Sequence, residues 1–112
     1  MTYRVEERLP GAVVVSIEGR ITVENGDGAF VQAIEHVLAS GPRHVTVDLH
    51  KVTTIDSIGL GELVAGYLRA KRAGCRLGIV RANDRVLEVL RVTRLATFLL
   101  DPAPVLGQPA LV

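Results

Sequence analysis

The 112-residue sequence predicts a single α/β domain in which helices pack on a mixed, mostly parallel β-sheet. Runs of β-branched residues, typical of strands, alternate along the chain with segments whose apolar residues recur at helical spacing. The first two strand-like runs are separated only by Pro10-Gly11, a turn dipeptide that indicates a hairpin. The expected order is β-β-α-β-α-β-α-β, and its alternating part implies parallel strands joined by right-handed crossovers.

The amino-terminal half begins with the predicted hairpin. Residues 2–9 alternate loosely, and residues 12–19, AVVVSIEG, form a continuous β-branched run typical of a strand with a buried centre. After the turn-forming ENGDG, Asp27 is a plausible N-cap for a helix. One face of that helix carries Phe30, Ile34, Val37 and Leu38, and Gly41-Pro42 ends it.

The middle of the chain predicts a short strand and a second helix. HVTVDL, residues 44–49, is β-branched, and the helix follows HKVTTIDS. Its expected apolar stripe consists of Leu60, Leu63, Val64, Tyr67 and Leu68 and turns polar at Lys71. We expect Leu60, Leu63, Val64 and Leu68 to be buried against Val14, Val45, Val47 and Ile79 in one core.

The carboxy-terminal part predicts three further segments and a tail. CRLGIV reads as a strand, and Asn83 or Asp84 is expected to cap a third helix whose inward side chains are Val86, Leu87, Val89 and Leu90. ATFLL, residues 96–100, is expected to form a last short strand. Residues 101–112 contain three prolines and no periodicity, so we expect a domain over residues 1–100 and a proline-rich tail over 101–112.

Composition excludes several classes of protein. No apolar run is long enough to span a membrane, and the start has no apolar core of a secretory signal. Cys75 is the only cysteine, which fits a reduced, cytoplasmic setting. The net charge is +1, although residues 66–100 carry eight basic and two acidic side chains. We interpret that excess as the solvated faces of two helices and expect no direct contact with nucleic acid.

The stretch TTIDSIGLGELVAGYL, residues 53–68, raises the question of what Ser57 does. A serine nucleophile needs a histidine base and an orienting acid, and the only histidine near in sequence is His50. The stretch does not match the nucleophile-elbow motif or a phosphate-binding loop, because no lysine follows Gly59-Leu60-Gly61. The histidines, the cysteine and the carboxylates show no metal-ligand spacing. We therefore expect no enzymatic activity, no cofactor and no metal.

Two other interpretations of this stretch remain. Asp56 or Ser57 can cap the second helix, which stabilises such a helix by about 1 kcal/mol. Gly59 disfavours a helix start by up to about 1 kcal/mol relative to alanine, which indicates that something approaches the backbone closely there. We expect Gly59 to be exposed to a docking partner. A helix N-terminus also accommodates anions, so a phosphorylated Ser57 fits this position.

The run VDLHKVTTIDSIGLGELVAGYLRAKRAGCRLGIV resembles the STAS-domain anti-sigma factor antagonists of bacteria. The resemblance covers about residues 3–100, and its most specific piece is D-S-x-G-L at residues 56–60; DRVLEVLRVTRLATFL also looks like the family. It implies a STAS-like fold that acts by binding. It further implies that Ser57 is phosphorylated by a partner that is both anti-sigma factor and serine kinase, with Asp56, Ile58 and Gly59 in the docking loop. The unphosphorylated domain would bind that partner and free the sigma factor, with a serine phosphatase as a further candidate partner.

The sequence departs from the family pattern at three places. Ile58 replaces a frequent Ser or Thr, and the acidic motif after the second strand is replaced by residues 19–22, which places Thr22 in the expected partner-binding set. The usual C-terminal helix has no clear counterpart in the tail. An alternative function keeps the fold: a STAS subunit of a lipid-transport (ABC) or stressosome-type signalling complex, in which the same helix face docks permanently.

Overall fold

The fold is a four-stranded mixed sheet in a computed structural model that describes residues 1–22 and 28–100. The strands are β1 (Thr2–Leu9), β2 (Ala12–Ile21), β3 (His44–Ile55) and β4 (Arg76–Val80), in the spatial order β1-β2-β3-β4. β1 is antiparallel to β2, whereas β2, β3 and β4 are parallel. The structure thus confirms the expected α/β class, the initial hairpin and the mostly parallel sheet.

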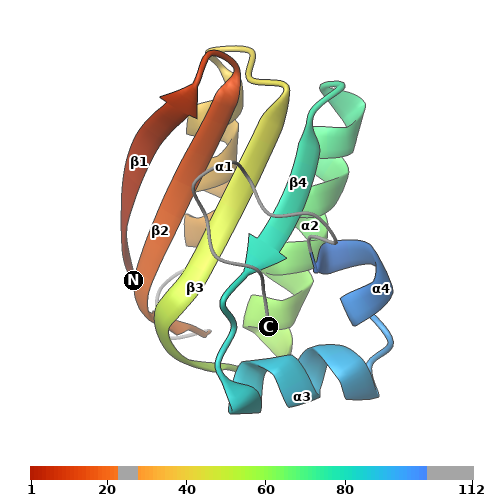
Figure 1. Cartoon of the computed structure of the whole chain (residues 1–112). Helices are drawn as coiled ribbons and strands as arrows, with labels where there is room; N and C mark the ends of the chain where they lie inside the picture. Colours follow the sequence, from red (N-terminus) through yellow and green to blue (C-terminus); the bar gives the residue numbers. More distant parts are fainter. Residues whose placement is uncertain (23–27, 101–112) are drawn as a thin grey trace.

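Four helices complete the described part: α1 (Ala29–Leu38), α2 (Ser57–Arg72), α3 (Asp84–Val92) and α4 (Ala96–Leu99). Figure 1 shows α1 and α2 together on one face of the sheet, α3 across the end where the parallel strands finish, and α4 beside β4. The core lies between the sheet and the two long helices. Its fully buried members include Val15, Val47, Ile79, Phe30, Ile34 and Leu63.

The buried face of α2 is rotated relative to the stripe expected from the sequence. It consists of Gly59, Leu63, Gly66 and Ala70. Leu63 is fully buried as expected, Leu60 and Val64 are only half-buried, and the expected burial of Leu68 is wrong because 45% of it is exposed. The small residues let α1 approach, since a Cβ on Gly66 would lie 2.7 Å from Cε2 of Phe30.

The partners expected for that stripe are buried, with one difference. Val45, Val47 and Ile79 belong to the core under the helices. Val14 is also buried, but the core members on its strand are its neighbours Val13 and Val15. Since successive side chains of a strand point to opposite faces, Val14 belongs to the other face of the sheet.

Two segments differ from their expected secondary structure. β3 continues to Ile55, because residues 51–55 extend the parallel ladder with β2 across two irregularities in register. The expected last strand at residues 96–100 is wrong: Ala96–Leu99 is the short helix α4, and only Leu100 pairs, in an isolated parallel bridge with Ile79. A mostly apolar segment of five residues is too short for periodicity to distinguish a strand from a helical turn.

Side-chain caps fix where α2 and α3 begin, whereas α1 and α4 have no side-chain cap within the described residues. Asn83 caps α3 as expected: its Oδ1 accepts the N–H of Val86 at 2.8 Å, and its Nδ2 donates to the carbonyl of Val52 at 2.8 Å. This second bond ties the start of α3 to β3. The N-cap expected for the first helix, Asp27, lies outside the described residues. At the start of α1, the N–H of Phe30 donates to Oε1 of Glu62, on α2, at 2.9 Å.

Candidate functional site

The candidate site lies where β2 and β3 end and α2 begins. The parallel register pairs Ile21 with Ile55, so Thr22 and Asp56 leave the sheet as neighbours. The N–H of Asp56 donates to the carbonyl of Ile21 at 3.4 Å, which extends this pairing to the first residue after the strand. α2 starts at Ser57 without a connecting loop. The position of Ser57 is therefore set by the sheet.

Asp56 is the N-cap of α2, which decides between the two caps that the sequence allowed. Its Oδ1 accepts the N–H of Gly59 at 2.8 Å, and its main-chain oxygen accepts the N–H of Leu60 at 2.8 Å. Ser57 is exposed, and within the described part of the chain its hydroxyl makes no hydrogen bond. Because the Asp56 side chain caps the helix, the Ser57 hydroxyl is not needed as the cap and faces solvent.

Gly59 does not have the exposure that we expected. It is buried, and a Cβ built on it would lie 1.8 Å from the carbonyl oxygen and 2.6 Å from the carbonyl carbon of Ile21. The close approach inferred from this glycine is real, but the group that approaches is the backbone of β2. The exposed glycine of the turn is Gly61, around whose Cβ position there is open space. The sequence alone did not distinguish these two glycines.

The other expected site residues separate into exposed and buried groups. Ile58, beside Ser57, is 50% exposed although it is a large apolar residue. Thr22 is only 6% exposed, and Asp56 is half-buried beneath the turn. The structure thus gathers all five expected residues at one place, but only Ser57 and Ile58 present substantial surface.

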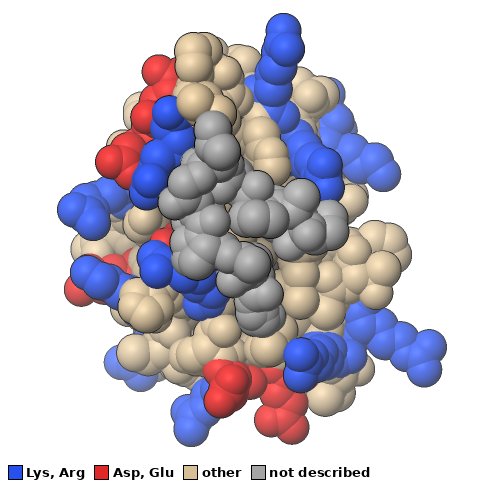
Figure 2. All heavy atoms as spheres, in the orientation of Figure 1, with Lys and Arg blue, Asp and Glu red and all other residues tan. Residues whose placement is uncertain are grey.

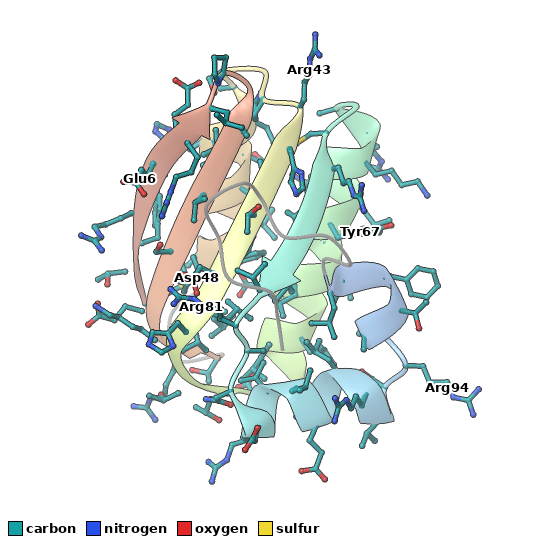
Figure 3. All side chains as sticks on the ribbon, in the orientation of Figure 1. Glu6, Arg43, Asp48, Tyr67, Arg81 and Arg94 are labelled. Atoms are coloured by element: carbon teal, nitrogen blue, oxygen red, sulfur yellow. The ribbon has the colours of Figure 1, made fainter. Side chains whose placement is uncertain are left out.

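A cavity elsewhere on the sheet is lined by an ion pair between Asp48 and Arg81. It has a volume of about 360 Å³, and its lining includes Arg4, Asp48, Lys51 and Arg81 but not Ser57. The buried carboxylate of Asp48 accepts from Nη2 of Arg81 at 2.5 Å and from Nε at 3.3 Å (Figure 3). This hydrogen bonding raises the pKa of Arg81. The pair joins β3 to the end of β4, where Arg81 has a φ of 55°.

Cys75 and the possible metal ligands are the other chemically relevant side chains in the described residues. Burial raises the pKa of the Cys75 thiol, and a thiol kept protonated is a poor nucleophile. No group of histidine, cysteine and carboxylate side chains in residues 1–22 and 28–100 is arranged to hold a metal ion.

The β-β-α-β-α-β-α order, with an exposed serine opening the helix after the third strand, defines a STAS-type domain. A family model described as Mlab, STAS domain, matches residues 5–101. The chain belongs to the STAS-domain family that includes the anti-sigma factor antagonists. No curated protein sequence matched the chain. No helix in the part that the structure describes is long and apolar enough to cross a membrane.

Solved structures agree with this assignment. An anti-sigma factor antagonist from Mycobacterium paratuberculosis is 32% identical, with 91% of this chain and 86% of that chain covered and a TM-score of 0.76. A putative anti-sigma factor antagonist from Thermotoga maritima is 20% identical over 88% and 83% of the two chains, with a TM-score of 0.72. The Bacillus cell fate determinant SpoIIAA in its phosphorylated form is 14% identical over 91% and 92%, with a TM-score of 0.67. The last two show the shared fold.

Proposed function

We propose that this domain is an anti-sigma factor antagonist that binds an anti-sigma factor with serine kinase activity while Ser57 is unphosphorylated. Phosphorylation of Ser57 by that partner ends binding, and a serine phosphatase restores it. The domain acts by binding, in the cytoplasm where transcription is regulated, and has no catalytic chemistry of its own. The observation that carries the proposal is the exposed Ser57 hydroxyl at the first residue of α2, beside a cap that does not need it.

The buried residues of the site have a positioning role in this proposal. Gly59 and Thr22 hold the start of α2 against the end of β2, and Asp56 fixes its first turn. Ser57 and Ile58 then form the contact with the partner. An exposed isoleucine favours burial in an interface, since covering apolar surface stabilises by about 25 cal/mol per Å².

The effect of phosphorylation differs between the domain and the complex. Phosphate adds about −1.5 to −2 charges at pH 7. Within the domain, the dipole of α2 favours this charge by about 0.3–1 kcal/mol, while the neighbouring Asp56 opposes it. In a complex, the same charge would lie in a contact that includes Ile58, and burying an unpaired charge costs several kcal/mol. The cost in the complex is larger, so docking is lost while folding is kept.

The test compares partner binding by wild type, Ser57→Ala, Ser57→Asp and the Ser57-phosphorylated domain. The partner is the anti-sigma factor captured from the native cell and then purified. We expect wild type and Ser57→Ala to bind alike, and the phosphorylated form to bind more than about a hundredfold more weakly, which corresponds to about 3 kcal/mol. Ser57→Asp should also bind poorly. All four should have similar melting temperatures. Equal affinity of all four forms would refute the switch.

The alternative of a permanent subunit keeps the same fold, and the matching family model is described as Mlab, STAS domain, with no mention of an anti-sigma factor. If the domain is a permanent subunit, the partner captured from the native cell would bind it with an affinity that does not depend on the state of Ser57. A partner with transporter or signalling-complex subunits, bound equally by Ser57→Ala and Ser57→Asp, would establish this alternative.

A further inference from the structure

β1 is an open edge of the sheet. All eight of its residues are exposed, and no element in the described ranges lies beside it on the outer side (Figure 1). The opposite edge is different, since Leu100 forms a bridge with Ile79 of β4. An edge strand presents unpaired backbone N–H and C=O groups that can bind another strand.

An apolar row runs across the whole sheet and stops at this edge. Paired residues from β4 to β1 are Ile79, Val47, Val15 and Val5. The first three are completely buried under the helices, whereas Val5 is 47% exposed. The row therefore ends in an uncovered valine at the middle of the edge strand.

The opposite face of β1 carries charges in a self-complementary order. Arg4 and Glu6 lie on either side of Val5, and Arg8 forms an ion pair with Glu6 at 2.8 Å. Figure 2 shows basic and acidic side chains interspersed along this side of the molecule, and Figure 3 shows Glu6 projecting from β1. Charges of one sign would repel a second copy of this strand, whereas this mixed pattern allows attractive pairs between two copies.

A second copy of the chain fits this edge in one register. A two-fold axis perpendicular to the sheet keeps each face on its own side, so two β1 strands can run antiparallel with Val5 opposite Val5. Arg4 of each copy then lies opposite Glu6 of the other, and nearly the full length of both strands overlaps. Sliding the strands by two residues places Glu6 opposite Glu6 in one direction and Arg4 opposite Arg4 in the other, both of which are unfavourable.

We propose that β1 binds β1 of a second copy in this register, so that two domains form one continuous eight-stranded sheet. The contact is a single strand wide and therefore weak, with a dimer that forms at about micromolar to millimolar concentrations. The proposal does not depend on the function proposed above. Ser57 follows β3, two strands away from β1, so pairing leaves its surface free.

Sedimentation velocity over about 10–1000 µM protein tests the pairing. Arg4→Glu alone and Glu6→Arg alone each convert two attractive pairs into two repulsive ones, and each should weaken the dimer by about tenfold or more. The combined Arg4→Glu/Glu6→Arg variant recreates both attractive pairs and should recover most of the wild-type affinity. Circular dichroism confirms that each variant is folded. A monomeric wild type, or single variants that dimerise as well as wild type, would overturn the proposal.

Cross-linking tests the register separately. In the proposed dimer, Val5→Cys places two thiols opposite each other, whereas Tyr3→Cys leaves its thiols about four residues, or about 13 Å, apart along the strands. A short thiol cross-linker should therefore join Val5→Cys and not Tyr3→Cys. Cys75 is buried and serves as the unreactive background. Equal cross-linking of both variants would overturn this register.

Discussion

Gly59 and Gly61, two residues apart in the first turns of α2, have opposite surroundings. Gly59 faces the carbonyl of Ile21, a backbone group that cannot move aside as a flexible side chain would. Gly61 faces open space. The helix propensity of glycine is equally poor at both positions, so the difference in their roles comes entirely from tertiary contact.

Substitution by alanine should separate these two roles. Gly59→Ala should lower the free energy of unfolding by about 1–3 kcal/mol, because its methyl group would displace α2 from the end of β2. Gly61→Ala, the matched control, should leave stability unchanged or raise it by up to about 1 kcal/mol. Urea denaturation followed by circular dichroism measures both. A Gly59→Ala variant as stable as wild type would contradict the close packing described here.

At the scale of the element, the sequence predicted α2 itself well and its orientation less well. Asp56 and Ser57 indicated where α2 starts, and the periodic apolar residues after them indicated its length. The large residues Leu60, Val64 and Leu68 suggested the inward face, but the structure buries Leu63 together with two glycines and an alanine. A helix can pack closely against another helix through small residues. Glycine and alanine contribute little to a hydrophobic pattern, so the pattern does not reveal such a face. The packing of Phe30 against Gly66 is such a contact.

The rotated face of α2 predicts unequal effects of two leucine truncations. Leu63→Ala removes a fully buried side chain from the core and should cost about 2–5 kcal/mol of stability. Leu68→Ala, one and a half turns further on and 45% exposed, should change stability by less than about 1 kcal/mol. Thermal or chemical denaturation of both variants checks this. Equal losses would support the stripe expected from the sequence instead of the observed face.

At the scale of the molecule, the α/β class and the mixed sheet followed from alternating strand and helix patterns, since these depend on local periodicity. The last strand and the burial of Gly59 did not follow, because both depend on which distant backbone lies alongside. At the site, Gly59, which packs against the backbone of Ile21, and Thr22 are buried. Ser57 and Ile58 are exposed and are the residues proposed to contact a partner. In the first turn of α2, buried and exposed residues are thus only one or two positions apart: Gly59 is buried, whereas Ser57 and Ile58 are exposed.

This separation predicts a variant that loses binding without losing stability. Ile58→Ala should leave the melting temperature within about 2 °C of wild type, because half of Ile58 is already in solvent. If the proposed contact is right, this variant should weaken binding of the captured partner by about tenfold or more, because covering a large exposed apolar residue beside Ser57 would contribute to that contact. Leu68→Ala is the control, because it removes a similarly exposed apolar residue ten positions along the same helix, about 15 Å away. Binding that falls equally in both variants would locate the contact along the whole helix, and binding unaffected by Ile58→Ala would remove this turn from the interface.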